Sequence, residues 1–220
     1  MIHVQLTQKL QEQLPQARIE AICLPTVEEI KLWLINADFP THGLSADQAE
    51  AVMRNPNYWI FCWASGLVLA RYILDHASLF AGKRVIDFGA GSAVAGIAAK
   101  LAGAREVIAC DIDPMAIEVA KANADLNHVD LSYALDFFEI QGPIDIIIVA
   151  DVLYDSQNLP WLDRFIARSP LVYVADSRVK NFNVSPYQLI YQQISSTVPD
   201  LDEFDEFRNV RVYRAARSAG

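Results

Sequence analysis

A glycine-containing turn in the middle of the chain is the first place where residue types and spacing suggest chemistry. The apolar run KRVIDF includes Asp87, and Gly89 and Gly91 follow at alternate positions before the alanine-rich segment AVAGIAAKLAG. This pattern predicts a strand, a tight turn and a helix, with backbone amides at the helix start exposed to a small ligand. The turn lacks the Gly-Lys-Ser/Thr ending of a nucleotide triphosphatase loop, since no lysine follows until Lys100.

Two features of the turn separate the remaining ligands. A dinucleotide fingerprint reads G-x-G-x-x-G, but Val94 stands where the third glycine belongs and the next glycine is Gly96. Asp87 places negative charge where it would repel a pyrophosphate and would attract a ligand that carries an ammonium and a sulfonium. S-adenosylmethionine carries both groups, and the order Asp87, Gly89, Gly91 is the D-x-G-x-G arrangement of class I methyltransferases.

Further carboxylates follow the next predicted strands and extend this cofactor site. Asp111 ends EVIACD, 20 residues after Gly91, where it can accept hydrogen bonds from both ribose hydroxyls, a device that NAD enzymes share. Ile112 would then pack on the adenine face, whereas Asp113 is expected to cap the helix that follows. Asp136, after the weak strand LSYAL, is either a contact of the adenine amino group or an ordinary loop aspartate.

The acceptor side of the site is expected after the strand DIIIVAD, where Tyr154 stands three residues beyond Asp151. Methyl transfer to an amine is an in-line displacement, so a hydrogen-bond acceptor beside the methyl group helps to align the incoming lone pair. Asp151 would hold the amine, and Tyr154 would close the pocket against water. The competing interpretation is a strand-end aspartate that caps the next turn and a tyrosine that covers the core.

The chain resembles a known family over roughly residues 57 to 180. The segments that carry the likeness are, in order, NPNYWIFCWASGLVLARYILD, VIDFGAGSAVAGIAAKLAGAREVIACDIDP and DVLYD. They look like the electron transfer flavoprotein β-subunit lysine methyltransferases and their bacterial relatives. The resemblance implies a seven-stranded fold and S-adenosylmethionine as cofactor. It also implies the following contacts: Asp87, Gly89, Gly91 and Asp111 on the cofactor, Trp63 beside its methionine end, and Asp151 and Tyr154 at the acceptor pocket.

The chain departs from that family's pattern at two places. Where the family usually reads W-P-G-G, the segment that begins at Trp63 reads WASG, and Ser65 fits only if its side chain clears the ligand. Where the family commonly reads D-P-G-R, the segment that begins at Asp176 reads DSRV, in a loop that borders the expected acceptor site. The cofactor assignment is compatible with both changes, but a particular protein substrate does not follow from the resemblance.

The elements that must position these residues follow a regular rhythm from residue 63 onward. Apolar strands alternate with amphipathic helices through short loops, which predicts an α/β, doubly wound, Rossmann-like sheet, with late antiparallel strands at its edge. Residues 63–220 are expected to form the methyltransferase domain, and residues 1–62 an N-terminal helical flank or lid. In that flank Thr26 is expected to cap a helix over TVEEIKLWLIN, and SADQAEAVMRNP is expected to form another helix.

Composition sets the remaining expectations. The chain has 220 residues, and 18 basic against 27 acidic side chains give a formal net charge of −9 without a basic patch, which argues against nucleic acid as a partner. Cys23, Cys62 and Cys110 lack metal-binding spacing, so we expect reduced buried thiols and no metal site. The amino terminus lacks the pattern of a signal peptide and no segment is apolar enough to span a bilayer, so we expect a cytoplasmic protein without a membrane partner.

Together these patterns predict an S-adenosylmethionine-dependent methyltransferase that acts on nitrogen, with a lysine of a protein substrate as the favoured acceptor. The first alternative is the same chemistry on a small amine. The second is a non-catalytic protein that binds S-adenosylmethionine, and the intact set of Asp87, Asp111 and Asp151 speaks against it.

Overall fold

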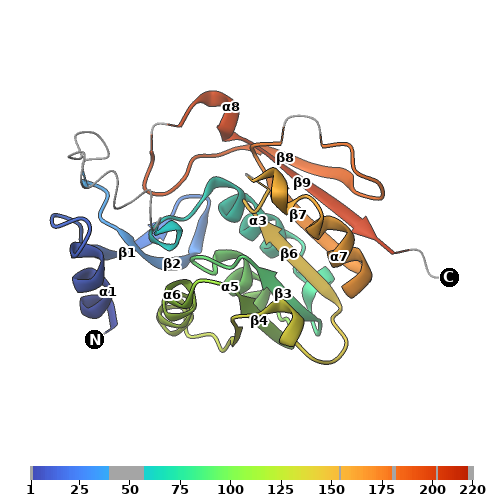
Figure 1. The fold of residues 1–220 in the computed structure, drawn as a ribbon, viewed down its shortest axis with the longest axis horizontal. Coiled ribbons are helices and arrows are strands. Elements are labelled where there is room, and N and C mark those ends of the chain that lie inside the picture. The colour runs from blue at the N-terminus through green and yellow to red at the C-terminus, as the bar shows by residue number, and fades with distance from the viewer. Residues whose placement is uncertain (1, 40–56, 154, 180–181, 202, 218–220) are drawn as a thin grey trace.

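The computed structural model describes residues 2–39, 57–153, 155–179, 182–201 and 203–217. Its centre is a seven-stranded sheet in the order β5-β4-β3-β6-β7-β9-β8 (Figure 1). The strands are β3 (Arg84–Phe88), β4 (Glu106–Cys110), β5 (Ser132–Ala134), β6 (Ile146–Ala150), β7 (Leu171–Asp176), β8 (Gln188–Ile194) and β9 (Asn209–Ala216). The strands from β3 to β7 pair in parallel, whereas β9 runs antiparallel to β7 and β8. The predicted doubly wound sheet with late antiparallel strands is therefore confirmed.

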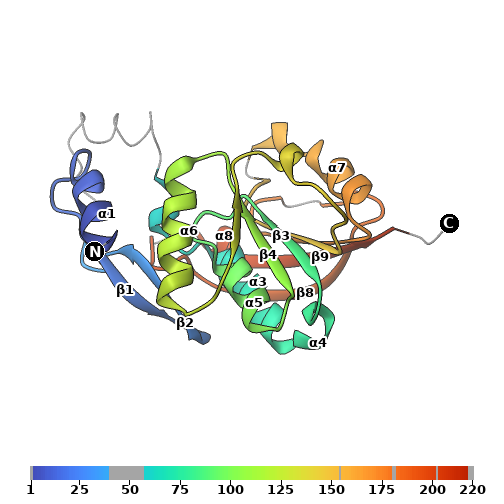
Figure 2. The ribbon, with the colours of Figure 1, turned by 90° about the horizontal axis from the view of Figure 1, so that it is seen from below.

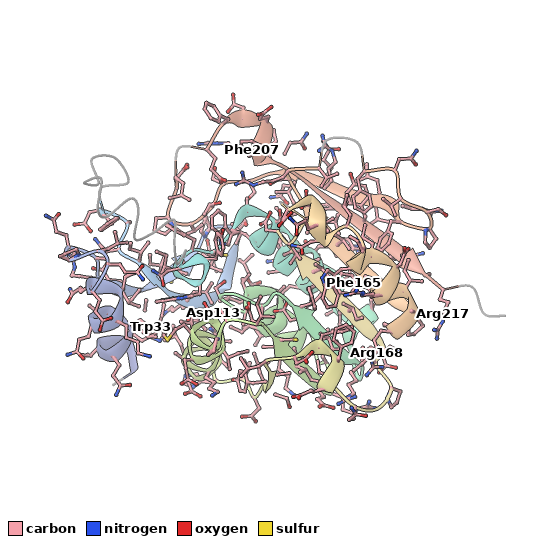
Figure 3. The ribbon with its side chains drawn as sticks, in the orientation of Figure 1. Trp33, Asp113, Phe165, Arg168, Phe207 and Arg217 are labelled. Carbon is pink, nitrogen blue, oxygen red and sulfur yellow. The ribbon has the colours of Figure 1, made fainter. Side chains whose placement is uncertain are left out.

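Helices cover both faces of this sheet. Figure 2 shows α3 (Ala64–Asp75) and α5 (Val94–Leu101) on one side and α7 (Trp161–Arg168) on the other. Side chains alternate between the faces along each strand, so Val85 of β3 joins the core under α3 and α5, whereas Ile86 joins the core that contains Phe165 of α7 (Figure 3). Asp87 lies two residues beyond Val85 and therefore faces α5.

Further helices and short 3₁₀ turns lie between these elements. They are α4 (Ala77–Phe80), α6 (Pro114–Leu126), α8 (Asp205–Arg208) and the 3₁₀ turns η1 (Tyr58–Ile60), η2 (Phe137–Glu139) and η3 (Ser156–Asn158). Residues 195–201, after β8, run back to the start of α3, where Cys62 and Val198 form an isolated antiparallel bridge. In the described part of the chain, no helix combines the length and the apolar character needed to cross a bilayer.

The N-terminal segment forms a helix and a hairpin beside α6 (Figures 1 and 2). The helix α1 (Ile2–Gln11) is followed by β1 (Ile19–Leu24) and β2 (Val27–Ile35), which pair antiparallel. The expected helix over TVEEIKLWLIN is therefore wrong. Ile30, Leu32 and Leu34 are fully buried at alternate positions, which is the period of a strand, and Thr26 lies in the hairpin turn with a φ of 67° instead of capping a helix.

Two other expectations meet the structure here. The segment SADQAEAVMRNP lies outside the described residues, and the boundary at residue 62 stays a prediction. Ile30, Leu32 and Leu34 nevertheless share one buried cluster with apolar residues of α3 and α5, so the hairpin packs directly on the sheet's helical layer. Of the three cysteines, Cys62 and Cys110 are buried as expected, but Cys23 is exposed.

Candidate functional site

The predicted site residues gather at the carboxyl ends of the parallel strands. The chain builds β4 and β5 on one side of β3 and then returns to build β6 and β7 on the other, so β3 and β6 are neighbours where the order reverses. Ligands of open α/β sheets bind in the crevice at such a point. The turn after β3 and the loop after β6 meet there closely, since a Cβ on Gly89 would lie 2.7 Å from Val152 Cγ2.

Left-handed backbone shapes the glycine turn. Gly89, Gly91 and Ala93 have φ values of 67°, 51° and 61°. Glycine adopts such values without strain, which explains the two glycines but leaves Ala93 in a conformation that its Cβ disfavours. Among the described residues, a Cβ added at Gly91 would meet only the Gly89 carbonyl oxygen within 4 Å, at 4.0 Å, so this part of the structure leaves the space beside Gly91 open. A ligand can therefore lie against this part of the turn.

The amides of the turn are bound within the protein. The N–H groups of Gly89 and Ala90 donate to the Cys110 carbonyl at 2.8 and 3.1 Å, and the Gly91 N–H donates to Asp111 Oδ2 at 2.9 Å. A phosphate-binding loop aims such amides at its ligand. These three amides are therefore not available to a ligand, which is a further argument against a phosphate at the turn.

Asp87 lies beneath the turn, not in it. Its side chain is 3% exposed, and its Oδ2 accepts a hydrogen bond of 2.8 Å from the Gly96 N–H in the first turns of α5. Gly96 is required there, because a Cβ would stand 2.8 Å from that same oxygen. Burial raises the pKa of Asp87 to about 7, against the lowering effect of the Gly96 hydrogen bond, and the charge of Asp111 raises it further. Its predicted contact with the methionine amino group stays a prediction.

Asp111 ties the end of β4 to the glycine turn. Besides the Gly91 bond, its Oδ1 accepts from the Asp113 N–H at 3.0 Å, and each carboxylate oxygen retains a second lone pair for a ligand. Burial raises its pKa. Beside it Ile112 is 89% exposed, an apolar side chain without cover at the place predicted for adenine. Asp113 (Figure 3) caps α6 through the Met115 N–H at 2.8 Å, which confirms the predicted cap.

Asp136 and Trp63 both make hydrogen bonds within the protein. Asp136 caps η2, since its Oδ1 accepts from the Phe138 N–H at 2.8 Å, so the loop interpretation accounts for one of its oxygens. Trp63 occupies the N-cap position of α3 and donates from Nε1 to the Tyr58 carbonyl at 2.9 Å. The ligand contacts predicted for Asp136 and Trp63 stay predictions.

On the acceptor side, Asp151 is bound to the start of α3. Its Oδ2 accepts from the Ser65 N–H at 3.0 Å and its Oδ1 from Ser65 Oγ at 2.6 Å. The carboxylate thus accepts a hydrogen bond from a free N–H at the start of α3, as an N-cap side chain would. Trp63, the N-cap residue itself, makes no side-chain capping bond. Ser65 is fully buried, and its hydroxyl is bound to Asp151. Whether its side chain clears a ligand stays a prediction.

The surroundings of Asp151 are acidic and strained. Burial raises its pKa to about 7, the Ser65 hydrogen bond lowers it, and the nearby charge of Asp176 raises it. Asp151 also has a φ of 52°, in the left-handed region that is unfavourable for residues other than glycine. Strain of this kind is common at functional positions. Tyr154, the other predicted acceptor residue, lies outside the described residues.

The loop that departs from the family pattern is organised by Asp176. Its Oδ1 accepts from the N–H groups of Arg178 and Val179 at 2.8 and 2.7 Å, while its buried Oδ2 has no hydrogen-bond partner among the residues that the structure describes. Arg178 forms an ion pair of 2.9 Å with Glu203, and its guanidinium lies 4.5 Å from the ring centre of Phe207 (Figure 3). These contacts fix the loop after β7 to the segment before β9.

Sequence reasoning missed two polar connections in this site. Ser65 is expected from the sequence to lie beside the ligand, yet its N–H and hydroxyl bind Asp151, 86 residues away. Asn123 of α6 was not considered, although its side-chain amide bonds both the glycine turn and β2. Neither has a local signature, because the partners come from separate elements that only the fold brings together.

Comparisons with known proteins agree with this geometry. The family model described as ribosomal protein L11 methyltransferase matches residues 69–157. The electron transfer flavoprotein beta subunit lysine methyltransferase of Xenopus laevis is 33% identical over 156 residues, which are 68% of this chain and 61% of that protein. Its counterpart in Mus musculus is 32% identical over 152 residues, 65% of this chain and 60% of that protein. The chain thus spans about three fifths of the length of these relatives.

Solved structures show the same fold at low sequence identity. Magnesium protoporphyrin IX methyltransferase from Synechocystis PCC 6803, with bound S-adenosylhomocysteine, matches with a TM-score of 0.53 and 14% identity, over 80% of this chain and 89% of that one. Ribosomal protein L11 methylase from Lactobacillus delbrueckii subsp. bulgaricus matches with a TM-score of 0.52 and 19% identity, over 68% and 78%. The seven-stranded sheet is that of class I methyltransferases.

Proposed function

We propose, on the premise that the chain is a relative of the electron transfer flavoprotein beta subunit lysine methyltransferases with the class I methyltransferase fold, that it methylates the side-chain nitrogen of a lysine in a protein substrate. The observation that carries the cofactor assignment is the bond between Asp111 and the Gly91 amide. It places a carboxylate and an open glycine turn side by side at the switch point of the sheet.

The residues of this edge fit S-adenosylmethionine. Asp111 would accept the ribose hydroxyls with its remaining lone pairs, the open side of Gly91 would admit the ligand, and exposed Ile112 would cover the adenine. The cofactor supplies a methyl group on a positively charged sulfur. Asp87 is buried beneath the turn, and its pKa of about 7 allows it to ionise near neutral pH. Its carboxylate would then add negative charge below a cationic ligand.

Asp151 would orient the acceptor. A lysine has an ordinary pKa of about 10.4, so it arrives mostly as an ammonium and must lose a proton before its lone pair can attack. A carboxylate nearby favours binding of the ammonium and opposes its deprotonation. The role of Asp151 is therefore binding and alignment, and Tyr154 would close the pocket.

The test of acceptor class is transfer of labelled methyl groups. Purified protein is incubated with S-adenosylmethionine that carries a radiolabelled methyl group and with lysates from which the cofactor has been removed. We expect label in a protein band and methylated lysine after hydrolysis. Label confined to small molecules would contradict the lysine acceptor, and no label together with no binding of S-adenosylhomocysteine would contradict the methyltransferase proposal as a whole.

The test of Asp151 compares Asp151→Asn with Asp163→Asn, which makes the same charge change at an exposed position on α7. We expect Asp151→Asn to bind S-adenosylhomocysteine normally and to lose most methyl transfer, with a smaller loss at high pH, where more of the acceptor is neutral. Tyr154→Phe should cost less activity, because the ring remains. Near wild-type turnover in Asp151→Asn would contradict the proposed role in orienting the acceptor and would leave Asp151 with only a structural role at the start of α3.

A further inference from the structure

The side chain of Asn123 forms a polar link between the N-terminal hairpin and the glycine turn. It lies in α6, is 0% exposed, and accepts a 2.7 Å hydrogen bond at Oδ1 from the backbone N–H of Trp33 in β2. Its Nδ2 donates a 2.9 Å hydrogen bond to the backbone carbonyl of Ser92 in the glycine turn. Both partners are backbone groups of fixed polarity, so the orientation of the Asn123 amide is determined.

The Ser92 carbonyl sits at the most constrained part of the turn. Gly91 before it and Ala93 after it both have left-handed φ values, and for alanine that conformation costs about 1 kcal/mol or more. A turn of this shape relaxes unless surrounding contacts hold it. The Asn123 amide is such a contact, and it is made from below the turn, where it does not obstruct the open space beside Gly91.

Asn127, one helical turn further along α6, provides an internal comparison. Its Oδ1 accepts from the Lys31 N–H at 2.9 Å and its Nδ2 donates to the Lys31 carbonyl at 2.6 Å, so it grips the same edge of β2 two residues before Trp33. Its other bond is to the Asn123 carbonyl, within α6. Both asparagines thus anchor the hairpin, but of the two only Asn123 is bonded to the glycine turn.

The hairpin that Asn123 grips is packed too firmly to be a loose cover. Ile30, Leu32 and Leu34 of β2 are 0% exposed and share a buried cluster with Val94 and Ala95, the first residues of the helix that the glycine turn begins. Removal of such apolar contacts costs several kcal/mol in protein cores. The hairpin therefore braces the start of α5 by packing and the turn by one polar bond.

We propose that Asn123 is a positioning residue of the cofactor site, which holds the glycine turn in its binding shape by linking it to the N-terminal hairpin. The hairpin is then a fixed support of the site and not a lid. This inference rests on the proposed function, because the ligand whose binding it affects is S-adenosylmethionine or its demethylated product.

The experiment uses three variants of the full chain. Asn123→Ala removes both bonds. Asn123→Asp retains an acceptor for the Trp33 N–H but sets a second oxygen against the Ser92 carbonyl, unless the carboxyl is protonated and can donate. Asn127→Ala is the matched control, since it loosens the same hairpin without touching the turn. The measurements are S-adenosylhomocysteine affinity by calorimetry between pH 6 and pH 8, and thermal stability without ligand.

We expect both alanine variants to melt at a lower temperature, but only Asn123→Ala to bind S-adenosylhomocysteine about tenfold more weakly or worse. Relative to wild type at the same pH, Asn123→Asp should also bind weakly at pH 8 and recover affinity as the pH falls and its buried carboxyl is protonated. The comparison with wild type removes the effect of Asp87, whose own charge is lost over the same range. A purely structural role would not produce that recovery. Unchanged affinity in Asn123→Ala, or equal weakening in Asn127→Ala, would overturn the proposal.

A second readout separates this proposal from the function on which it rests. Amide hydrogen exchange over residues 89–95, measured without ligand, should be faster in Asn123→Ala than in Asn127→Ala. If wild-type protein fails to bind S-adenosylhomocysteine, the proposed function fails, and the exchange data still decide whether Asn123 holds the turn. Equal exchange in the two variants would show that it does not.

Discussion

Replacement of Asp87 by asparagine tests the electrostatics of the buried carboxylate. Asp87 is 3% exposed, and burial raises its pKa to about 7, whereas an unfolded chain ionises it near 3.9. The folded state therefore holds a proton that the unfolded state releases between about pH 4 and pH 7, and stability falls as the pH rises through that range. The pKa of Asp87 differs by about three units between the folded and unfolded states. At about 1.4 kcal/mol per unit, this difference lowers the free energy of unfolding by about 4 kcal/mol above pH 7.

Asparagine removes this cost because its amide does not ionise, while its Oδ1 can still accept from the Gly96 N–H. The added NH₂ group loses its hydrogen bonds to water on burial, which cancels about 1–2 kcal/mol of the stability gained. We therefore expect Asp87→Asn to exceed the wild type in free energy of unfolding by about 2–3 kcal/mol at pH 8, with little or no advantage at pH 5. The same variant should bind S-adenosylhomocysteine more weakly, because it lacks the negative charge beneath the turn.

Urea unfolding at pH 5 and pH 8, with calorimetric titration of S-adenosylhomocysteine alongside, measures both effects. Asp163→Asn is the control, since it changes the net charge equally at an exposed position. A variant that is less stable than wild type at pH 8, or whose stability difference from wild type is the same at both pH values, would refute the reasoning.

Three other substitutions test neighbouring parts of the site. Asp111→Ala should weaken S-adenosylhomocysteine binding by about 1.5–3 kcal/mol, the usual loss for charged hydrogen bonds, and unchanged affinity in calorimetry would mean that the ribose lies elsewhere. Ile112→Ala should leave the melting temperature unchanged, because the side chain is 89% exposed, yet reduce that affinity by about 1 kcal/mol; equal affinity would remove it from the adenine site. Gly96→Ala should lower the free energy of unfolding by about 1–3 kcal/mol in urea, because its Cβ would stand 2.8 Å from Asp87 Oδ2, and normal stability would contradict that close approach.

The α/β core could be predicted because its signals are local. Buried parallel strands read as short apolar runs such as IIIVA, and the helix cap at Asp113 is a contact between residues two positions apart. The order of the carboxylates Asp87, Asp111 and Asp151 along the chain was also sufficient to place all three at one edge, since parallel strands end on the same side of a sheet.

The rest of the fold and site depended on distant partners. Ile30, Trp33 and Leu34 have the spacing of a helix face, whereas Ile30, Leu32 and Leu34 have the alternation of a strand. Pairing with β1 across the turn at Thr26 decides between the two. Likewise, the position of an aspartate at a strand end does not predict its hydrogen-bond partner. Asp151 accepts from Ser65 of α3, 86 residues earlier in the chain. The use of the glycine-turn amides within the protein follows from the position of the Cys110 carbonyl, which no spacing along the chain reveals.

The position of β9 has a consequence for synthesis of the protein on the ribosome. β9 lies between β7 and β8, although β8 precedes it in the chain. When β8 leaves the ribosome, the strand that joins it to the sheet has not yet been made, and β7 still presents an open edge. Exposed Leu189 and Ile194 on β8 make that interval prone to pairing between nascent chains. A release of the chain before Asn209 would make this vulnerable state permanent, so chaperone demand should be concentrated in the interval between synthesis of β8 and synthesis of β9.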